Sequence, residues 1–126
     1  MTKARWNFAR IPGLEAEKDA IRRRVREGRI PHAQLFLGDY GTATLGMALA
    51  AARLILCDES GEEPCETCSA CNVSYKWAHP NLHFSFPVVG TDLTSKEFLP
   101  KWREMLDLGP WFSPSDWFAY QGEEKK

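Results

Sequence analysis

The sequence predicts an α/β fold in which part of a parallel sheet carries a cysteine-rich insertion. Two patterns predict this class. A short apolar run ends at a glycine and leads straight into a long alanine- and leucine-rich segment, as where a buried strand turns into a helix. Four cysteines then fall within one short polar stretch, residues 57–71. The chain has 126 residues, which is the usual length of a single domain.

The first half of the chain is predicted to contain a helix, a strand and a second helix. Apolar residues recur at helical spacing over residues 14–28, and Gly28 is placed to end that helix. Pro31 prevents the helix from continuing, so the apolar run that follows, residues 34–37, is predicted to be a strand. Residues 43–56 contain strong helix formers and no proline, which predicts the next helix.

The second half is predicted to contain three further helices and one strand. A short helix is expected over residues 70–77 and a strand over residues 84–89, where Pro87 favours a sheet edge. A capping-box spacing predicts the start of a helix over residues 94–108. A proline and polar capping residues predict a last short helix over residues 113–120.

Composition and charge exclude several classes of protein. The chain has 16 Lys+Arg against 17 Asp+Glu, so its net charge of -1 gives no general electrostatic attraction for nucleic acid. The N-terminal residues lack the apolar core of a secretory signal, and the longest apolar run is far shorter than the roughly 20 residues that span a bilayer. We therefore expect a cytoplasmic protein with no membrane partner.

The four cysteines have the spacing of a metal site. Cys57, Cys65, Cys68 and Cys71 can supply four thiolates to one tetrahedral ion, which leaves no position for water and predicts a structural Zn²⁺. Such an ion would fold a polar insertion that has little apolar core of its own. An iron–sulfur cluster is an alternative, although its motif needs a later cysteine followed by proline, and Tyr75 stands in that region. Free thiols are the other alternative.

A phosphate-binding loop that has lost its chemical groups lies between the first predicted strand and the next helix. The G-x-x-x-x-G-K-[ST] pattern needs a second glycine, a lysine and a hydroxyl, where this chain has Ala43, Thr44 and Leu45. The lysine meets the β- and γ-phosphates and the hydroxyl holds Mg²⁺, so bound ATP and its hydrolysis are not expected. A plain strand-to-helix connection is the simpler interpretation. The degenerate loop comprises Gly38, Gly41, Thr42, Ala43, Thr44 and Leu45.

Aromatic residues crowd the C-terminal part of the chain. They favour packing in a core, because no basic groove surrounds them as a stacking platform for single-stranded DNA would require. The residues concerned are Trp102, Trp111, Phe112, Trp117, Phe118 and Tyr120.

Nearly the whole chain resembles one family. The matching features are the run IPGLEAEKDAIRRRVREGRIPHAQLFLG, the loop, the alanine-rich helix ending at Cys57, and the segments PCETCSAC and HPNLHF. Together they resemble the N-terminal AAA+ (P-loop NTPase-like) domain of bacterial DNA polymerase III clamp-loader subunits. The four cysteines match the zinc module of that family. Thr44 and Leu45 favour its delta-prime branch, in which the loop is often degraded, over the ATP-binding gamma/tau branch.

The resemblance implies a role and a set of partners. Residues 1–126 correspond to the N-terminal part of the ATPase-like domain, with the zinc insertion at about 57–71, and the lid and collar domains of the family are absent. The implied function is that of a non-hydrolysing stator in clamp loading, with no catalysis of its own. The implied partners are the gamma/tau and delta subunits, and through them the sliding clamp and primer–template DNA. An ATP-hydrolysing motor subunit and a zinc-dependent nucleic-acid-binding module are the alternatives.

Overall fold

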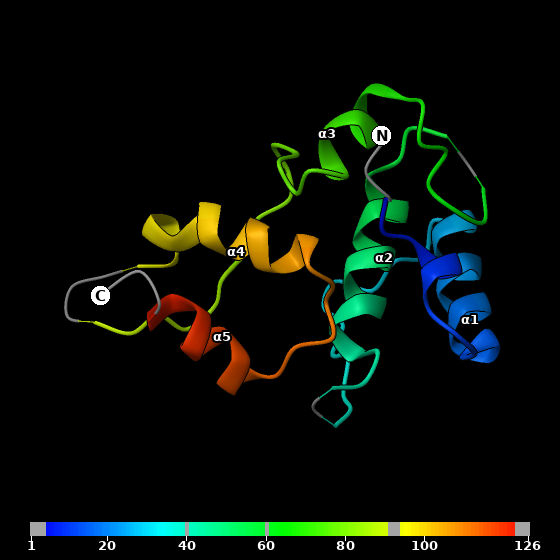
Figure 1. Cartoon of the computed structure of the whole chain (residues 1–126). Coiled ribbons are helices and arrows are strands. Elements are labelled where there is room, and N and C mark those ends of the chain that lie inside the picture. Colours follow the sequence, from blue (N-terminus) through cyan, green and yellow to red (C-terminus); the bar gives the residue numbers. More distant parts are fainter. Residues whose placement is uncertain (1–4, 40, 60, 91–93, 123–126) are drawn as a thin grey trace.

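The regular elements of the protein are helices. The computed structural model describes residues 5–39, 41–59, 61–90 and 94–122 (Figure 1). None of the helices in these ranges is long and apolar enough to cross a membrane. In chain order the elements are η1 (Phe8–Arg10), α1 (Glu15–Arg26), α2 (Thr44–Leu56), α3 (Ser69–Ser74), η2 (Ser95–Phe98), α4 (Leu99–Asp107) and α5 (Pro114–Gly122).

The predicted parallel-sheet α/β fold is wrong, since the described residues contain no β-strand. The first expected strand, residues 34–37, connects α1 to α2 without regular structure. Phe36 packs against the core formed by these helices, while Leu35 and Leu37 are 84% and 88% exposed. A strand is defined by hydrogen bonds to a neighbouring strand, and none lies beside this segment among the described residues. The apolar run is therefore present without a sheet.

The second expected strand, residues 84–89, is held by side chains instead of by a neighbouring strand. The Phe86 N–H donates to Ser95 Oγ at 3.1 Å, and Ser95 Oγ lies 2.8 Å from the Phe86 carbonyl oxygen to which it donates. The Pro87 carbonyl accepts hydrogen bonds from Trp117 Nε1 at 2.8 Å and from the Gln121 amide at 3.1 Å. These groups from η2 and α5 satisfy the backbone of the segment, so it needs no sheet to be stable.

The predicted helices are confirmed, together with the features that start and stop them. Gly28, at φ +67°, follows the end of α1 in the left-handed conformation that glycine adopts without strain. Thr94 and Glu97 form the capping box before η2, which continues directly into α4. At α5 the Asp116 carboxylate accepts from the Ser113 N–H at 2.9 Å, which caps the last helix.

Two apolar clusters make up the core, and α2 contributes to both. One cluster lies between α1, α2 and η1, and the other gathers the aromatic residues of α4, α5 and the segment before them (Figure 1). In the second cluster Trp102 stacks on Phe86 with ring centroids 4.5 Å apart and meets Trp117 edge-on at 5.0 Å. This packing confirms the interpretation of Trp102 and Trp117 as core residues, whereas Trp111 and Phe118 remain partly exposed.

Trp6 connects the two clusters. Its side chain packs against both of them, and its indole N–H donates to the Gly46 carbonyl in α2 at 2.8 Å. The ring also meets Trp111 edge-on with centroids 5.8 Å apart. Gly46 permits this approach, because a Cβ there would lie 2.7 Å from the Trp6 ring.

We expect Gly46→Ala to destabilise the protein. The new methyl group would overlap the Trp6 ring, and overpacking of this kind costs about 1–3 kcal/mol, of which the better helix propensity of alanine offsets about 1 kcal/mol. Urea denaturation should therefore show a lower free energy of unfolding. Gly122→Ala in α5 is the matched control, because nothing lies within 4 Å of that position. Equal unfolding curves for the two variants would contradict the packing described for Trp6.

Candidate metal centre

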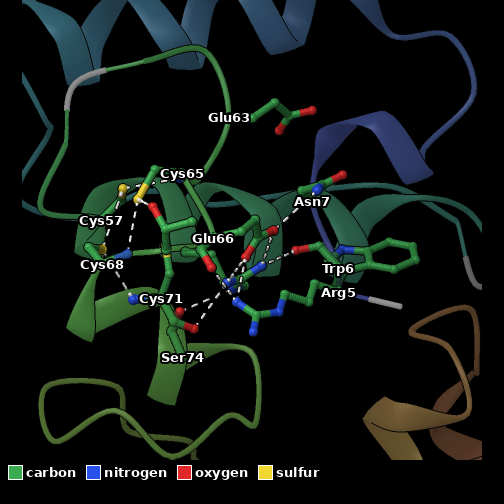
Figure 2. A network of polar contacts seen from close by, with 12 residues as sticks. Arg5, Trp6, Asn7, Cys57, Glu63, Cys65, Glu66, Cys68, Cys71 and Ser74 are labelled. Carbon is green, nitrogen blue, oxygen red and sulfur yellow. Dashed lines mark hydrogen bonds and ion pairs between the residues drawn. The ribbon is translucent and has the colours of Figure 1, made fainter. Parts of the chain in front are cut away.

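The four cysteine thiols converge at the C-terminal end of α2. Cys57 follows the last residue of that helix, Cys65 lies in the loop beyond it, Cys68 caps the N-terminus of α3, and Cys71 lies within α3. All four sulfur atoms lie within 4.8 Å of one another. Figure 2 shows the sulfur atoms gathered on one side of the loop, facing one another. The structure thus brings together the four residues that the spacing singled out.

The spacing of the sulfur atoms fits a metal ion and excludes a disulfide. Zn–S bonds of about 2.3 Å in a tetrahedron place the sulfur atoms about 3.8 Å apart. The Cys57 and Cys68 sulfur atoms lie 4.0 Å apart, close to that value and about twice the length of a disulfide bond. All four cysteines are free. The donor set is therefore four sulfur ligands in a closed arrangement.

Backbone amides of the loop point at the sulfur atoms. The Cys65 N–H donates to Cys57 Sγ, the Cys68 N–H to Cys65 Sγ and the Cys71 N–H to Cys68 Sγ, each at 3.3 Å. Such bonds favour the negatively charged thiolate, which is the form that binds metals. The loop therefore winds around the centre with its N–H groups turned inward.

The thiols differ in their intrinsic acidity. Hydrogen bonds from the backbone and then the hydroxyl of Thr67, followed by the Cys68 backbone, lower the pKa of the Cys65 thiol to about 6. Burial raises the pKa of Cys71 to about 12. The buried thiol is therefore the one that most needs a neighbouring cation in order to ionise.

A buried ion pair that the sequence analysis missed anchors this loop to α2. The Arg53 side chain is fully buried, and its guanidinium meets both oxygens of Glu66, at 2.6 and 3.0 Å. Glu66 lies between Cys65 and Cys68 and has φ of +66°, a left-handed conformation unusual for a residue with a side chain. The pair thus holds the turn that carries two of the four sulfur ligands.

Arg53 satisfies its remaining donors with other parts of the chain. It donates to the Trp6 carbonyl at 2.8 Å and to Ser74 Oγ at 3.1 Å, so one side chain joins the N-terminal segment, α2, the cysteine loop and α3. The sequence contains one signal of this ion pair, a single arginine within the otherwise apolar run 47–57. A buried arginine needs paired acceptors, and that requirement points to a carboxylate nearby.

The described residues of the segment interpreted from the sequence as a degenerate phosphate loop, 38, 39 and 41–45, lie at the opposite end of α2. The helix has 13 residues, so about 20 Å of helix axis separates its two ends, and the two sites predicted from sequence are not brought together. Thr42 Oγ1 donates to the Asp39 carbonyl at 2.5 Å and lies 3.0 Å from Thr44 Oγ1. A Cβ at Gly38 would overlap Thr44 Oγ1 at 2.2 Å, so the loop closes tightly on its own hydroxyl groups.

The other substituted loop residues face apolar surroundings. Ala43 packs against the first cluster and Leu45 against the second. Gly41 has φ of +79° and turns the chain into α2. A cavity of about 780 Å³ lies beside the loop, between α1, the segment 34–39 and the start of α2.

Comparison with known proteins identifies the family. The fold and the site define a helical chain in which four cysteines that could hold a metal ion cluster at one end of an apolar helix. The profile of the family described as "DNA polymerase III, delta subunit" matches residues 13–101, which is more than half of the chain. The chain belongs to this family.

Two curated relatives support that assignment. The chain is 41% identical over 63 residues to "DNA polymerase III subunit delta'" of Bacillus subtilis, covering 50% of this chain and 19% of the relative. It is 33% identical over 67 residues to the protein of the same name from Haemophilus influenzae, covering 53% of this chain and 20% of the relative. The match therefore spans about a fifth of the length of each relative. No solved structure matches.

We expect Arg53→Met to destabilise the protein by about 3 kcal/mol. The substitution removes one partner of a buried ion pair and leaves the Glu66 carboxylate, whose side chain is only 25% exposed, with only the longer contact to Arg5 at 3.5 Å. Urea denaturation measures the effect. Arg26→Met, at an exposed position of α1, is the matched control and should change the stability little. Similar losses in both variants would refute the anchoring role of Arg53.

Proposed function

We propose that this chain is a non-hydrolysing, stator-type component of the DNA polymerase III clamp loader, acting in the loading of the sliding clamp during DNA replication. Membership of the family and the printed names of both relatives support the assignment to the polymerase complex. The substitution of the lysine and of the Mg²⁺-binding hydroxyl in the phosphate-loop pattern supports the passive role. We assign to the chain no catalytic residue.

The observation that carries the passive role is that Thr44 and Leu45 are engaged in internal contacts. At the position where an active loop has its lysine, the Thr44 hydroxyl is engaged with Thr42. At the position of the Mg²⁺-binding hydroxyl, Leu45 packs into the core. The loop therefore offers neither the positive charge nor the metal ligand that transfer of the γ-phosphate requires.

The charges around the adjacent cavity also support a loop that does not bind ATP. The charged residues that line it, all in the described part of the chain, are Glu17, Arg24 and Asp39. One cation against two carboxylates gives the cavity a negative balance, which disfavours a nucleoside triphosphate. The same loop therefore lacks both the local contacts and the surrounding field that ATP would need.

The cysteine centre is proposed to hold a structural Zn²⁺ through Cys57, Cys65, Cys68 and Cys71. Four sulfur ligands complete a tetrahedron, so no position remains for a reacting water molecule. The loop that carries them, about residues 57–71, has little apolar packing of its own. Bound zinc would supply the folding free energy for this insertion.

The proposed partners are the gamma/tau and delta subunits, and through them the sliding clamp and primer–template DNA. They follow from the family and from the resemblance described above. Since the chain matches about a fifth of each relative, we propose that it represents the N-terminal part of the ATPase-like portion of such a subunit. Co-purification with a gamma/tau subunit tests this association, and failure of the two to associate would oppose it.

We expect the purified protein to bind no Mg-ATP at micromolar concentrations and to hydrolyse none. Isothermal calorimetry measures the binding, and phosphate release measures the hydrolysis. The triple variant Ala43→Gly, Thr44→Lys, Leu45→Thr restores the loop pattern and is the comparison that should gain Mg²⁺-dependent affinity. Turnover by the natural sequence, in proportion to its concentration, would instead identify an ATP-driven motor subunit.

We expect elemental analysis to find one zinc per chain. Cys71→Ser should lower the metal content well below one equivalent because it removes the most buried ligand, whereas Ser69→Ala on the same helix should leave it unchanged. Iron in place of zinc would overturn the assignment of the metal. A metal-dependent shift of single-stranded DNA at low salt would favour the nucleic-acid-binding alternative.

A further inference from the structure

The N-terminal segment of the described chain is bound chiefly to the cysteine loop. We name residues 5–10 the N-terminal strap. The strap passes over α2 and includes η1 (Figure 1). Most of its longer-range hydrogen bonds go to two acidic residues that flank the metal ligands, Glu63 and Glu66. This connection is not explained by the proposed function.

Glu63 holds the middle of the strap through backbone groups. Its two carboxylate oxygens accept hydrogen bonds from the Phe8 N–H at 3.0 Å and from the Ala9 N–H at 2.8 Å. These N–H groups lie in the first turn of η1, where no carbonyl of the helix itself can reach them. Glu63 stands two positions before Cys65, so its placement depends on the conformation of the loop.

Glu66 holds the start of the strap. Its backbone carbonyl accepts from Arg5 at 2.7 Å, and its carboxylate accepts from the Asn7 amide at 3.3 Å. Arg5 also lies over the ring of Tyr75, 4.1 Å from its centroid. Glu66 directly follows Cys65, so a change in the position of that ligand would move both of its strap contacts.

Arginines hold these two glutamates in part, Glu66 through Arg53 at 2.6 Å and Glu63 through Arg22 at 3.9 Å, but they do not order the rest of the loop. Between Cys57 and α3 the described residues form no helix or strand, and an irregular polar segment gains little from apolar burial to offset its ordering entropy. A cation bound by the four sulfur atoms would fix both ends of the segment at one point. Removing it would leave four close thiol groups with no attraction between them.

We propose that metal binding at the cysteine centre and ordering of the N-terminal strap are thermodynamically coupled through Glu63 and Glu66. This inference rests on the proposed metal centre. The strap also carries Trp6, which packs against both core clusters. The coupling must be reciprocal: weakening the strap weakens metal binding by the same factor.

Hydrogen exchange followed by mass spectrometry tests the first direction. With zinc bound, the amides of Phe8 and Ala9 should exchange slowly. After addition of a strong chelator they should exchange markedly faster, while the amides of α4 keep their protection as an internal control. Unchanged exchange in the strap after confirmed loss of the metal would overturn the proposal, as would loss of protection across the whole chain.

Zinc affinity, measured by competition with a chromogenic chelator, tests the reciprocal direction. Glu63→Ala and Arg5→Met should each weaken zinc binding about fivefold or more, the lower end of typical coupling between two sites. Each has a matched control. Glu62→Ala removes a neighbouring carboxylate that makes no side-chain contact to the strap, and Arg10→Met removes an exposed arginine of the strap itself.

The two pairs of variant and control distinguish failure of the coupling from failure of the metal centre. If Glu63→Ala does not fold, Arg5→Met still tests the coupling, because Arg5 is only partly buried and touches no sulfur ligand. Equal zinc affinities within both pairs would refute the coupling while leaving the metal centre intact. Absence of bound metal in the natural sequence would refute the metal centre and the coupling with it.

Discussion

The ion pair between Arg53 and Glu66 is the constraint on which the arrangement of this protein depends. A fully buried guanidinium in an apolar helix must find acceptors within reach, and it finds them in three different segments of the chain. The pair joins α2 to the turn that carries Cys65 and Cys68. The metal centre is therefore attached to the most apolar helix of the molecule, and the N-terminal strap is attached to the metal centre.

The two ends of the helix α2 carry different groups of side chains. At its C-terminal end four sulfur atoms converge in a geometry that suits a tetrahedral cation. At its N-terminal end the positions that handle phosphate in active relatives of the loop pattern carry Thr44 and Leu45, which are occupied with internal contacts. One end of the helix thus presents four clustered thiols, and at the other end the corresponding side chains make internal contacts.

Local features of the sequence predicted local structure well, and non-local features were predicted poorly. The helices, Gly28 at the end of α1 and the capping box at Thr94 depend on a few neighbouring residues, and all were predicted correctly. The cysteine spacing identified all four clustered thiols. The prediction of a sheet was wrong because an apolar run forms a strand only if another strand pairs with it. Arg53 and Glu66 were missed because their pairing is evident only in three dimensions.

The exposed leucines between α1 and α2 affect how copies of the chain interact with one another. Leu35 and Leu37 project from residues 34–37, which contain no charged residue and no proline. Both side chains remain exposed to water, which is unfavourable for apolar groups. Exposed apolar side chains of this kind favour adhesion between copies of the chain, and salts that strengthen apolar contacts favour it further.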